Sequence, residues 1–396
     1  MEKLNFLKGL FVIAISLTLV QCTSDDPIPG PAGAQGATGV NGINGTNGTN
    51  GIDGGNVCLS CHNVDFKVVQ PATYAVSDHA LGAALPGRNN SCLNCHSDEG
   101  YKASYATGDI TTTFTTTATT QTIFNCTTCH SGGHASAALA ISGKDAALRS
   151  AGFYKLNQKT AAGADVIIDY KDNSNACVHC HQPRRTDVTG LAPATSGTNI
   201  GKIALSSSTG PHYGVQSAML EGIFASEVAG TVAYPAKGTA VHRTGASCVQ
   251  CHMGKAKDGK GNHTFVPVLD NCKTCHTGAG VVNYNINGGQ TKIKNLMLEL
   301  AEEMVRLRPA DFRIANYTGT KPFTAPNVFT DAAFSANQLT VIATRQYDST
   351  IAADVRITKG YWNWRFVYQD HSYGLHNPKY TEALMKNTVA DLKLLP

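Results

Sequence analysis

The sequence has few charged and few aromatic side chains. Only 15% of the 396 residues are Asp, Glu, Lys or Arg, and only 7% are Phe, Trp or Tyr, whereas about 25% of a typical globular chain is charged. The 32 basic and 28 acidic residues give a formal net charge of +4. So small an excess does not indicate a nucleic-acid partner, because such partners require dense basic patches.

The N-terminal region also lacks a hydrophobic run long enough to span a bilayer. Its apolar segment Gly9–Val20 has twelve residues, whereas a membrane-spanning helix needs about 20. Lys3 and Lys8 lie just before this segment, and a basic stretch followed by a short apolar run is typical of an export signal. Residues 1–21 are therefore expected to be a signal peptide.

Cysteine, in contrast, is abundant and regularly spaced. Twelve of the 13 cysteines lie in six copies of the pattern Cys-x-x-Cys-His, which is typical of covalent haem c attachment. Zinc ribbons, disulfide frameworks and single redox pairs have no need of a histidine directly after each cysteine pair. Each copy, called a motif here, is named by its first cysteine: Cys58-Cys61-His62, Cys92-Cys95-His96, Cys126-Cys129-His130, Cys177-Cys180-His181, Cys248-Cys251-His252 and Cys272-Cys275-His276.

The chemistry of haem c explains the spacing within each motif. Two cysteines capture the two vinyl groups of the porphyrin as thioethers, and the next residue then lies under the iron. A histidine at that position supplies the proximal axial ligand. The sequence therefore predicts six covalently bound haem c groups, whose propionates would outweigh the small formal positive charge.

Eight histidines remain once the six proximal ones are assigned. Methionine would be the other common axial ligand, but only Met219 and Met253 lie in the motif-rich region. Bis-histidine coordination is therefore expected. His179, inside the Cys177 motif, is open to either a ligand role or a hydrogen-bonding role, and His371 is expected to be solvated. The candidate distal ligands are His79, His134, His212, His242, His263 and His376.

The sequence "LVQC" at the end of the apolar run resembles a bacterial lipoprotein signal, with Cys22 as the acylated residue. Ordinary cleavage nearby is the alternative, because Gln21 stands where a small residue is usual. The following "TSDDP" resembles the surface-export signal of Bacteroidetes lipoproteins. These resemblances imply a lipid-anchored protein of the outer membrane or cell surface, or one that faces the periplasm.

A glycine-rich segment follows, in which glycine occupies every third position from Gly30 to Gly54. The repeat resembles collagen, but Pro31 is the only proline within it, and stable triple helices need roughly 15–20% proline or hydroxyproline. A solvated linker over residues 22–56 is therefore favoured, with a trimerising stalk as the alternative.

Residues 57–286 form the motif-rich region, which shows little helical periodicity and contains the threonine-rich stretch 111–122. Porphyrins are expected to supply much of its apolar core. Residues 287–396 differ, with helices predicted over 293–307, between Thr291 as N-cap and Pro309 as stop, over 349–369, where a strand is the alternative, and from Pro378, with Asn377 as N-cap. The expected fold is mainly α with extensive irregular loops, a haem-packed core and C-terminal helices that close over the haems.

The "HNP" element at His376, after an aromatic helix and the lead-in "DHSYG", resembles the end of multihaem cytochromes related to cytochrome c nitrite reductase. That resemblance implies that His376 is a distal haem ligand. The nitrite reductases carry a catalytic haem motif that ends in lysine, but all six motifs here end in histidine, which argues against reductase activity.

Two functions are consistent with these residues. In the first, the protein is a hexahaem electron carrier between membrane-associated donors and periplasmic or extracellular acceptors, with other redox proteins as partners. In the second, it is a reductase of nitrite, hydroxylamine or a similar small oxyanion, with one open haem site. The sequence leaves open a homo-oligomer or a filament of stacked subunits.

Overall fold

The computed structural model describes residues 70–82, 90–107, 122–130, 148–149, 152–255, 257–278, 281–315 and 338–396. The chain divides into two compact units, Met1–Ile52 and Asp53–Pro396, and every described residue belongs to the second. The expected signal peptide, Cys22, the linker, the Cys58 motif and His134 all lie outside the described residues. None of the described helices is long and apolar enough to cross a membrane.

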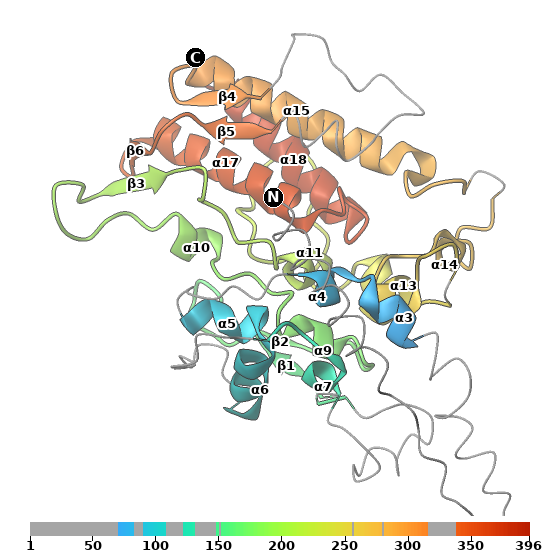
Figure 1. Ribbon diagram of the computed structural model, residues 1–396. Coiled ribbons are helices and arrows are strands. Elements are labelled where there is room, and N and C mark those ends of the chain that lie inside the picture. The colour runs from blue at the N-terminus through green and yellow to red at the C-terminus, as the bar shows by residue number, and fades with distance from the viewer. Residues whose placement is uncertain are drawn as a thin grey trace, which may run out of the picture. The chain divides into compact units, whose positions relative to one another are not determined.

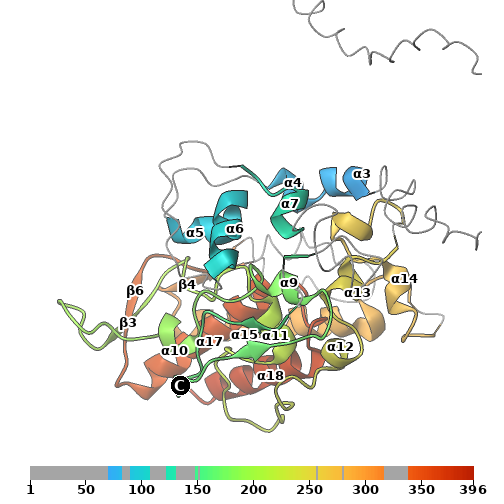
Figure 2. The same ribbon diagram turned by 90° about the horizontal axis from the view of Figure 1, so that it is seen from below.

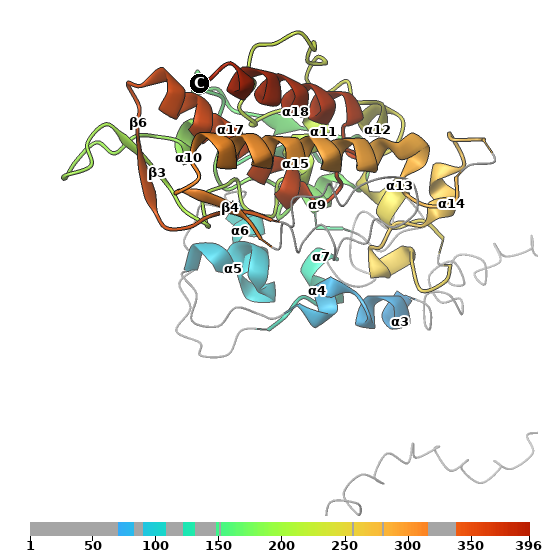
Figure 3. The ribbon, with the colours of Figure 1, turned by 90° about the horizontal axis from the view of Figure 1, so that it is seen from above.

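Three C-terminal helices lie side by side (Figure 1, Figure 3) and provide half of the buried residues of the hydrophobic core. They are α15 (Gly289–Leu307), α17 (Ala352–Asp370) and α18 (Pro378–Lys393), and they pack against one another. Their shared core contains the fully buried side chains Met297, Met304, Trp364, Leu384 and Leu392.

The predicted start of α15 is wrong by three residues. Thr291 is not the N-cap, because the helix already begins at Gly289, after Gly288 in the left-handed conformation. The side chain of Asn285 replaces the expected cap: its Oδ1 accepts from the Thr291 backbone N–H at 3.0 Å and its Nδ2 donates to Thr291 Oγ1 at 2.7 Å. The helix ends at Leu307, in agreement with the predicted stop at Pro309.

The two last helices form where the sequence predicts helices. The aromatic stretch is the helix α17, and the strand alternative is wrong, because its side chains are buried on every face from Tyr361 to Asp370 and no partner strand pairs with them. Asn377 caps α18 by accepting from the backbone N–H of Tyr380 at 3.2 Å, and Pro378 is the first helical residue. Both predictions for α18 are confirmed.

The strands among the described residues are short. They form three antiparallel pairs: β1 (Tyr154–Lys155) with β2 (Ile167–Ile168), β3 (Lys202–Leu205) with β6 (Arg345–Asp348), and β4 (Phe312–Ile314) with β5 (Leu339–Val341). The β3–β6 pair joins the motif-rich region to the residues that lead into α17.

The motif-rich region consists of short helices linked by loops, and its helices α3 to α7 lie to one side of α15, α17 and α18 (Figure 2). The large hydrophobic cluster begins only at Leu156; before it, Leu93 and Tyr101 are the buried hydrophobic residues that the described ranges contain. The mainly α fold with irregular loops and C-terminal helices is therefore confirmed. The short helices are α3 (Gln70–Ala75), α4 (Asp78–Leu81), α5 (Asn90–His96), α6 (Asp98–Thr107), α7 (Cys126–Cys129), α9 (Asn175–Val178), α10 (Asp187–Gly190), α11 (Gln216–Glu221), α12 (Val241–Thr244), α13 (Cys248–His252), η2 (Asn262–Thr264), α14 (Leu269–Cys272) and η3 (Ile286–Gly288).

The close approach of α10 to α17 yields a test of this packing. A Cβ atom on Gly190 would lie 2.1 Å from the ring of Trp362, which is fully buried. Because the rigid indole cannot move aside, we expect Gly190→Ala to lower the free energy of unfolding by about 1–3 kcal/mol. Chemical denaturation of the mature protein measures this change. Gly152→Ala is the matched control, since a Cβ there meets no atom within 4 Å; equal midpoints for the two variants would contradict the packing.

Candidate functional site

Five of the six motifs lie in the described residues, and each is wound into a single turn. In such a turn the backbone N–H of the histidine donates to the carbonyl of the first cysteine, as from His130 to Cys126 at 2.9 Å and from His276 to Cys272 at 2.8 Å. The turn carries both cysteines and the histidine on one short segment, as attachment to one porphyrin requires. None of the ten described cysteines is in a disulfide, and the described residues contain no cluster of three or more ligands for a bare metal ion.

Each described motif histidine faces one of the candidate distal histidines. Five pairs of imidazole rings result, from segments far apart in the sequence, and the separations of their centroids fall in a narrow range. The pairs are His79–His181 at 6.1 Å, His96–His212 at 6.3 Å, His130–His263 at 6.1 Å, His242–His276 at 6.2 Å and His252–His376 at 6.4 Å.

This separation is compatible with a metal ion shared by the two rings. A zinc–imidazole bond is about 2.0–2.1 Å long, an iron bond is similar, and the ring centroid lies ~1.1 Å beyond the nitrogen, so two imidazoles that held one ion would have centroids about 6.3 Å apart. Because aromatic rings in contact without a metal also span about 4.5–7 Å, the distinguishing feature is that every described motif histidine has a candidate distal histidine at this distance. The five pairs therefore fit an iron ion between each motif histidine and its partner.

Hydrogen bonds orient several of these rings in the way that metal binding requires. The Nδ1 atoms of His181, His252, His263 and His376 lie 3.0, 2.7, 2.6 and 2.7 Å from oxygen atoms of Gln216, Phe265, Asn262 and Asp370, and Nδ1 of His242 bonds to the carbonyl of Leu375. Because these oxygens only accept, Nδ1 carries the proton and Nε2 keeps its lone pair for a metal.

The protonation states also suit metal ligands, which must be neutral imidazoles. Burial lowers the pKa of His79, of His212 and of His263 to about 4. Burial also lowers the pKa of His181 and of His252. These five rings are therefore neutral at pH 7 before any metal is considered.

His376 differs because it bonds to a buried carboxylate. Burial alone would lower the pKa of His376, but the charge of Asp370 and the hydrogen bond to it outweigh burial and raise the pKa. Asp370 in turn accepts a hydrogen bond from Ser372 Oγ. This arrangement of carboxylate and histidine is the type that increases the basicity of a metal ligand.

His179 has a different environment, which decides between its two predicted roles. The residue is 1% exposed, and both ring nitrogens are used: Nε2 lies 2.9 Å from Ser104 Oγ, and Nδ1 lies 2.5 Å from the Tyr154 hydroxyl. No nitrogen is left for a metal, so His179 is a hydrogen-bonding residue that ties its motif to α6 and β1. His371 is exposed, as predicted, with its ring stacked on Tyr213 at 5.6 Å.

The Cys177 motif lies at the meeting point of several others. Cys95 Sγ lies 3.9 Å from the carbonyl oxygen of His179, inside this motif. Ser174 Oγ, just before the motif, donates to Ser247 Oγ at 2.9 Å and accepts from the backbone of the Cys248 motif at 3.1 Å. The Cys92, Cys177 and Cys248 motifs are therefore in direct contact.

Phe265 connects three of the histidine pairs. Its ring centroid lies 4.5 Å from that of His79 and 5.8 Å from that of His263, and its carbonyl oxygen accepts from His252. Phe265 has a positive φ of 58°, and this turn lets its side chain and its carbonyl serve different pairs.

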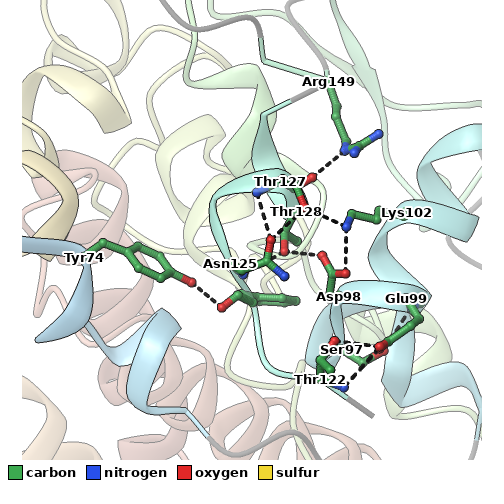
Figure 4. Close-up of polar contacts among 12 residues, drawn as sticks. Tyr74, Ser97, Asp98, Glu99, Lys102, Thr122, Asn125, Thr127, Thr128 and Arg149 are labelled. Atoms are coloured by element: carbon green, nitrogen blue, oxygen red, sulfur yellow. Dashed lines mark hydrogen bonds and ion pairs between the residues drawn. The ribbon is translucent and has the colours of Figure 1, made fainter. Parts of the chain in front are cut away.

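The Cys126 motif is held against α6 by a polar network (Figure 4). Asp98 accepts from Thr128 Oγ1 at 2.5 Å and pairs with Lys102 at 2.7 Å, and Lys102 also donates to Thr127 Oγ1 at 2.8 Å. Lys102 and the Thr128 hydroxyl together lower the pKa of Asp98 against the opposing effect of burial, so the carboxylate stays ionised. Since α6 follows directly after the Cys92 motif, the network fixes the spacing of the two motifs.

The residues that accept hydrogen bonds from the histidine Nδ1 atoms could not be found by searching the sequence for motifs. Gln216 and Asn262 lack a distinctive spacing, and the carbonyl oxygens of Phe265 and Leu375 leave no trace in the sequence. For Asp370 the sequence offers one indication, because this residue begins the segment "DHSYG" that precedes "HNP".

Comparison with known proteins agrees with the chemistry of these motifs. Residues 236–393 match the cytochrome c552 family. This segment contains the Cys248 and Cys272 motifs together with His376, and the match supports covalently bound haem c and electron transfer. No curated protein matches the chain.

One similar solved structure is that of the outer cell wall cytochrome OcwA. Its sequence is 18% identical, and the similarity covers 82% of this chain with a TM-score of 0.42. The chain spans half the length of that cytochrome, since 50% of it is covered.

Proposed function

We propose that the protein is an exported hexahaem c-type cytochrome that relays electrons between membrane-associated donors and periplasmic or extracellular acceptors. The observation that carries this proposal is the set of five histidine pairs with centroids 6.1–6.4 Å apart. When both axial positions of an iron are filled by the protein, no position is left for a substrate.

The proposed ligand sets combine motif and distal histidines. The twelve motif cysteines form the thioethers, and the distal ligands are His79, His212, His242, His263 and His376 in the five described pairs. The remaining motif histidine, His62, and the remaining candidate, His134, are assigned to each other, because six motifs and six candidates then pair completely. Haem c supplies reversible one-electron chemistry when it is bound.

The polypeptide contributes spacing and rigidity to this function. Direct contacts among the Cys92, Cys177 and Cys248 motifs, and the shared residue Phe265, hold neighbouring histidine pairs close together. The Asp98–Lys102 network does the same for the Cys126 motif. An electron carrier needs such fixed short distances, whereas a reductase needs one open coordination position with proton donors beside it.

Location and partners rest on the sequence. We propose export by the signal peptide of residues 1–21, acylation at Cys22, and a flexible tether over residues 22–56, which would place the cytochrome at the outer membrane or cell surface. Its partners would then be other redox proteins, reached from the lipid anchor.

The first test counts the haems and their spin states. We expect mass spectrometry of the mature protein to give six haem additions, and EPR of the oxidised protein to show only low-spin ferric iron that does not bind cyanide. Loss of the haem additions would refute the cytochrome. A stoichiometric high-spin species that binds nitrite or hydroxylamine and turns it over would favour the reductase.

Removing one distal ligand tests the assignments. We expect His376→Ala to convert one iron in six to the high-spin state, since His252 would lose its partner across the iron, while the number of covalent haems stays unchanged. His371→Asn is the matched control, because its exposed ring does not face another histidine ring at this spacing among the described residues; it should keep the wild-type EPR spectrum. A wild-type spectrum for His376→Ala would show that this ligand assignment is wrong.

The carboxylate behind His376 gives an independent test of the same iron site. Asp370→Asn removes the charge but keeps an oxygen for Nδ1, so the ligand becomes less basic and favours ferric iron less. We expect one of the six potentials to rise, by on the order of 59 mV for a tenfold change in a one-electron equilibrium, in spectroelectrochemical titration. Asp165→Asn is the control: it removes an exposed carboxylate paired with Lys155, and we expect all six potentials to remain unchanged.

A further inference from the structure

The most buried part of α17 contains four polar side chains whose partners can be compared. Between Tyr361 and Asp370 these are Asn363, Arg365, Gln369 and Asp370, and each is at most 7% exposed. Asn363 bonds to Ser226 and Thr388, and Asp370 bonds to His376 and Ser372.

Arg365 and Gln369 differ from the other two. No hydrogen bond or ion pair joins the Arg365 guanidinium to any residue in the described part of the chain, and its Nε is fully buried. The guanidinium lies over the ring of Tyr368, whose centroid is 5.7 Å from Cζ. Gln369, one helical turn later, has a buried Oε1 without a partner among the described residues. That oxygen only accepts, so an anion could bond to this side chain only through its Nε2.

A buried cation without a counter-charge is costly. The effective penalty for burying a charged group is several kcal/mol, and it is offset only by an anion with good hydrogen bonds. Arginine cannot avoid this cost by losing its proton, because its pKa is too high. The environment of Arg365 is therefore incomplete without a bound anion.

The loop that covers Arg365 is the loop that carries His212. A Cβ atom on Gly210 would lie 2.8 Å from Gln369 Oε1 and 3.3 Å from Arg365 Cβ, so this loop passes directly over both side chains. His212 follows two residues later, and its ring pairs with His96 at 6.3 Å. Arg365 and Gln369 thus lie under the segment that supplies one ring of the His96–His212 pair.

Two further arginines lie beside the same pair. Arg184 and Arg185 contribute, after burial, to lowering the pKa of His212, which places their charges near its ring. Arg184 Nη1 also donates to Cys92 Sγ at 3.7 Å, and Arg185 Nη2 donates to the Ser208 carbonyl at 3.1 Å. Both are exposed, whereas Arg365 is buried under the loop that carries His212.

We propose that Arg365, supported by Gln369, binds a carboxylate in this environment, and that the carboxylate is a propionate of the haem held by His96 and His212. A guanidinium matches a carboxylate in a bidentate geometry, and the Gln369 amide can donate to the same group from its nitrogen. This inference rests on the proposed haem function. A free carboxylate or oxyanion from solution has the same chemistry and is the other source that the experiment separates.

The test compares the redox potentials of the Arg365→Gln and Arg365→Lys variants, each purified with its haems. Removing a positive charge beside a propionate favours the ferric state, so we expect Arg365→Gln to shift one reduction equilibrium about tenfold toward oxidised iron, a fall of ~59 mV for one electron. Arg365→Lys keeps the positive charge but loses the bidentate guanidinium, so we expect it to lower the potential by less than Arg365→Gln does. Arg313→Gln is the matched control, since Arg313 is exposed and bonds only to Thr340 among the described residues.

The double variant Arg365→Gln with His212→Ala identifies which haem is affected. Loss of His212 makes the iron at His96 high-spin, so the change in potential caused by Arg365→Gln should then be seen for the high-spin haem. A shift that depends on the concentration of added nitrite, phosphate or acetate, and a wild-type potential that follows the same anion, would assign the site to a free anion instead. Unchanged potentials in haem-loaded Arg365→Gln, with no dependence on anions, would overturn the inference. Absence of haem in the wild-type protein would instead refute the proposed function, so the two failures are distinct.

Discussion

The pairing of imidazole rings across a gap of fixed width is the interaction on which the rest of this structure depends. Two rings with centroids about 6.3 Å apart are too distant for tight stacking and lie at the distance at which both could bind one metal ion. Five such pairs connect segments that are separated in the sequence. Before Leu156 the described residues contribute only Leu93 and Tyr101 to the buried hydrophobic residues, so the short helices there are arranged around these pairs. The large side-chain core begins at Leu156 and extends through α15, α17 and α18.

The C-terminal helices give the pairs a rigid support. The end of α17 and the start of α18 form one connected unit, in which Asp370 bonds to both His376 and Ser372 and Asn377 caps α18. This unit sets the position and the basicity of one imidazole at the same time. The buried arginine of the same helix lies under the loop that carries His212, so α17 contributes to two separate pairs through different side chains.

Contacts among the motifs follow from their crowding around the Cys177 motif. The contact of Cys95 with the His179 carbonyl, a pair of serines, and the side chain and carbonyl of Phe265 each bridge neighbouring sites. Such short bridges leave little room for relative movement. A protein that passes electrons benefits from this rigidity, because the distance between redox centres has to remain constant while their charge changes.

The sequence by itself determined the chemical type of the sites and the parts that build them. The repeated Cys-x-x-Cys-His pattern is local, because a single turn must present two thiols and one imidazole to the same porphyrin, and capping at Asn377 and Pro378 is local as well. The tertiary structure alone decided which rings meet. His79 lies opposite His181, and His212 lies opposite His96, about a hundred residues away in each case, because such contacts depend on the path of the whole chain. For the same reason it decided that the His179 ring bonds to Ser104 and Tyr154 instead of remaining available as a ligand. It also decided that Arg365 Nε is buried without a hydrogen-bond partner among the described residues.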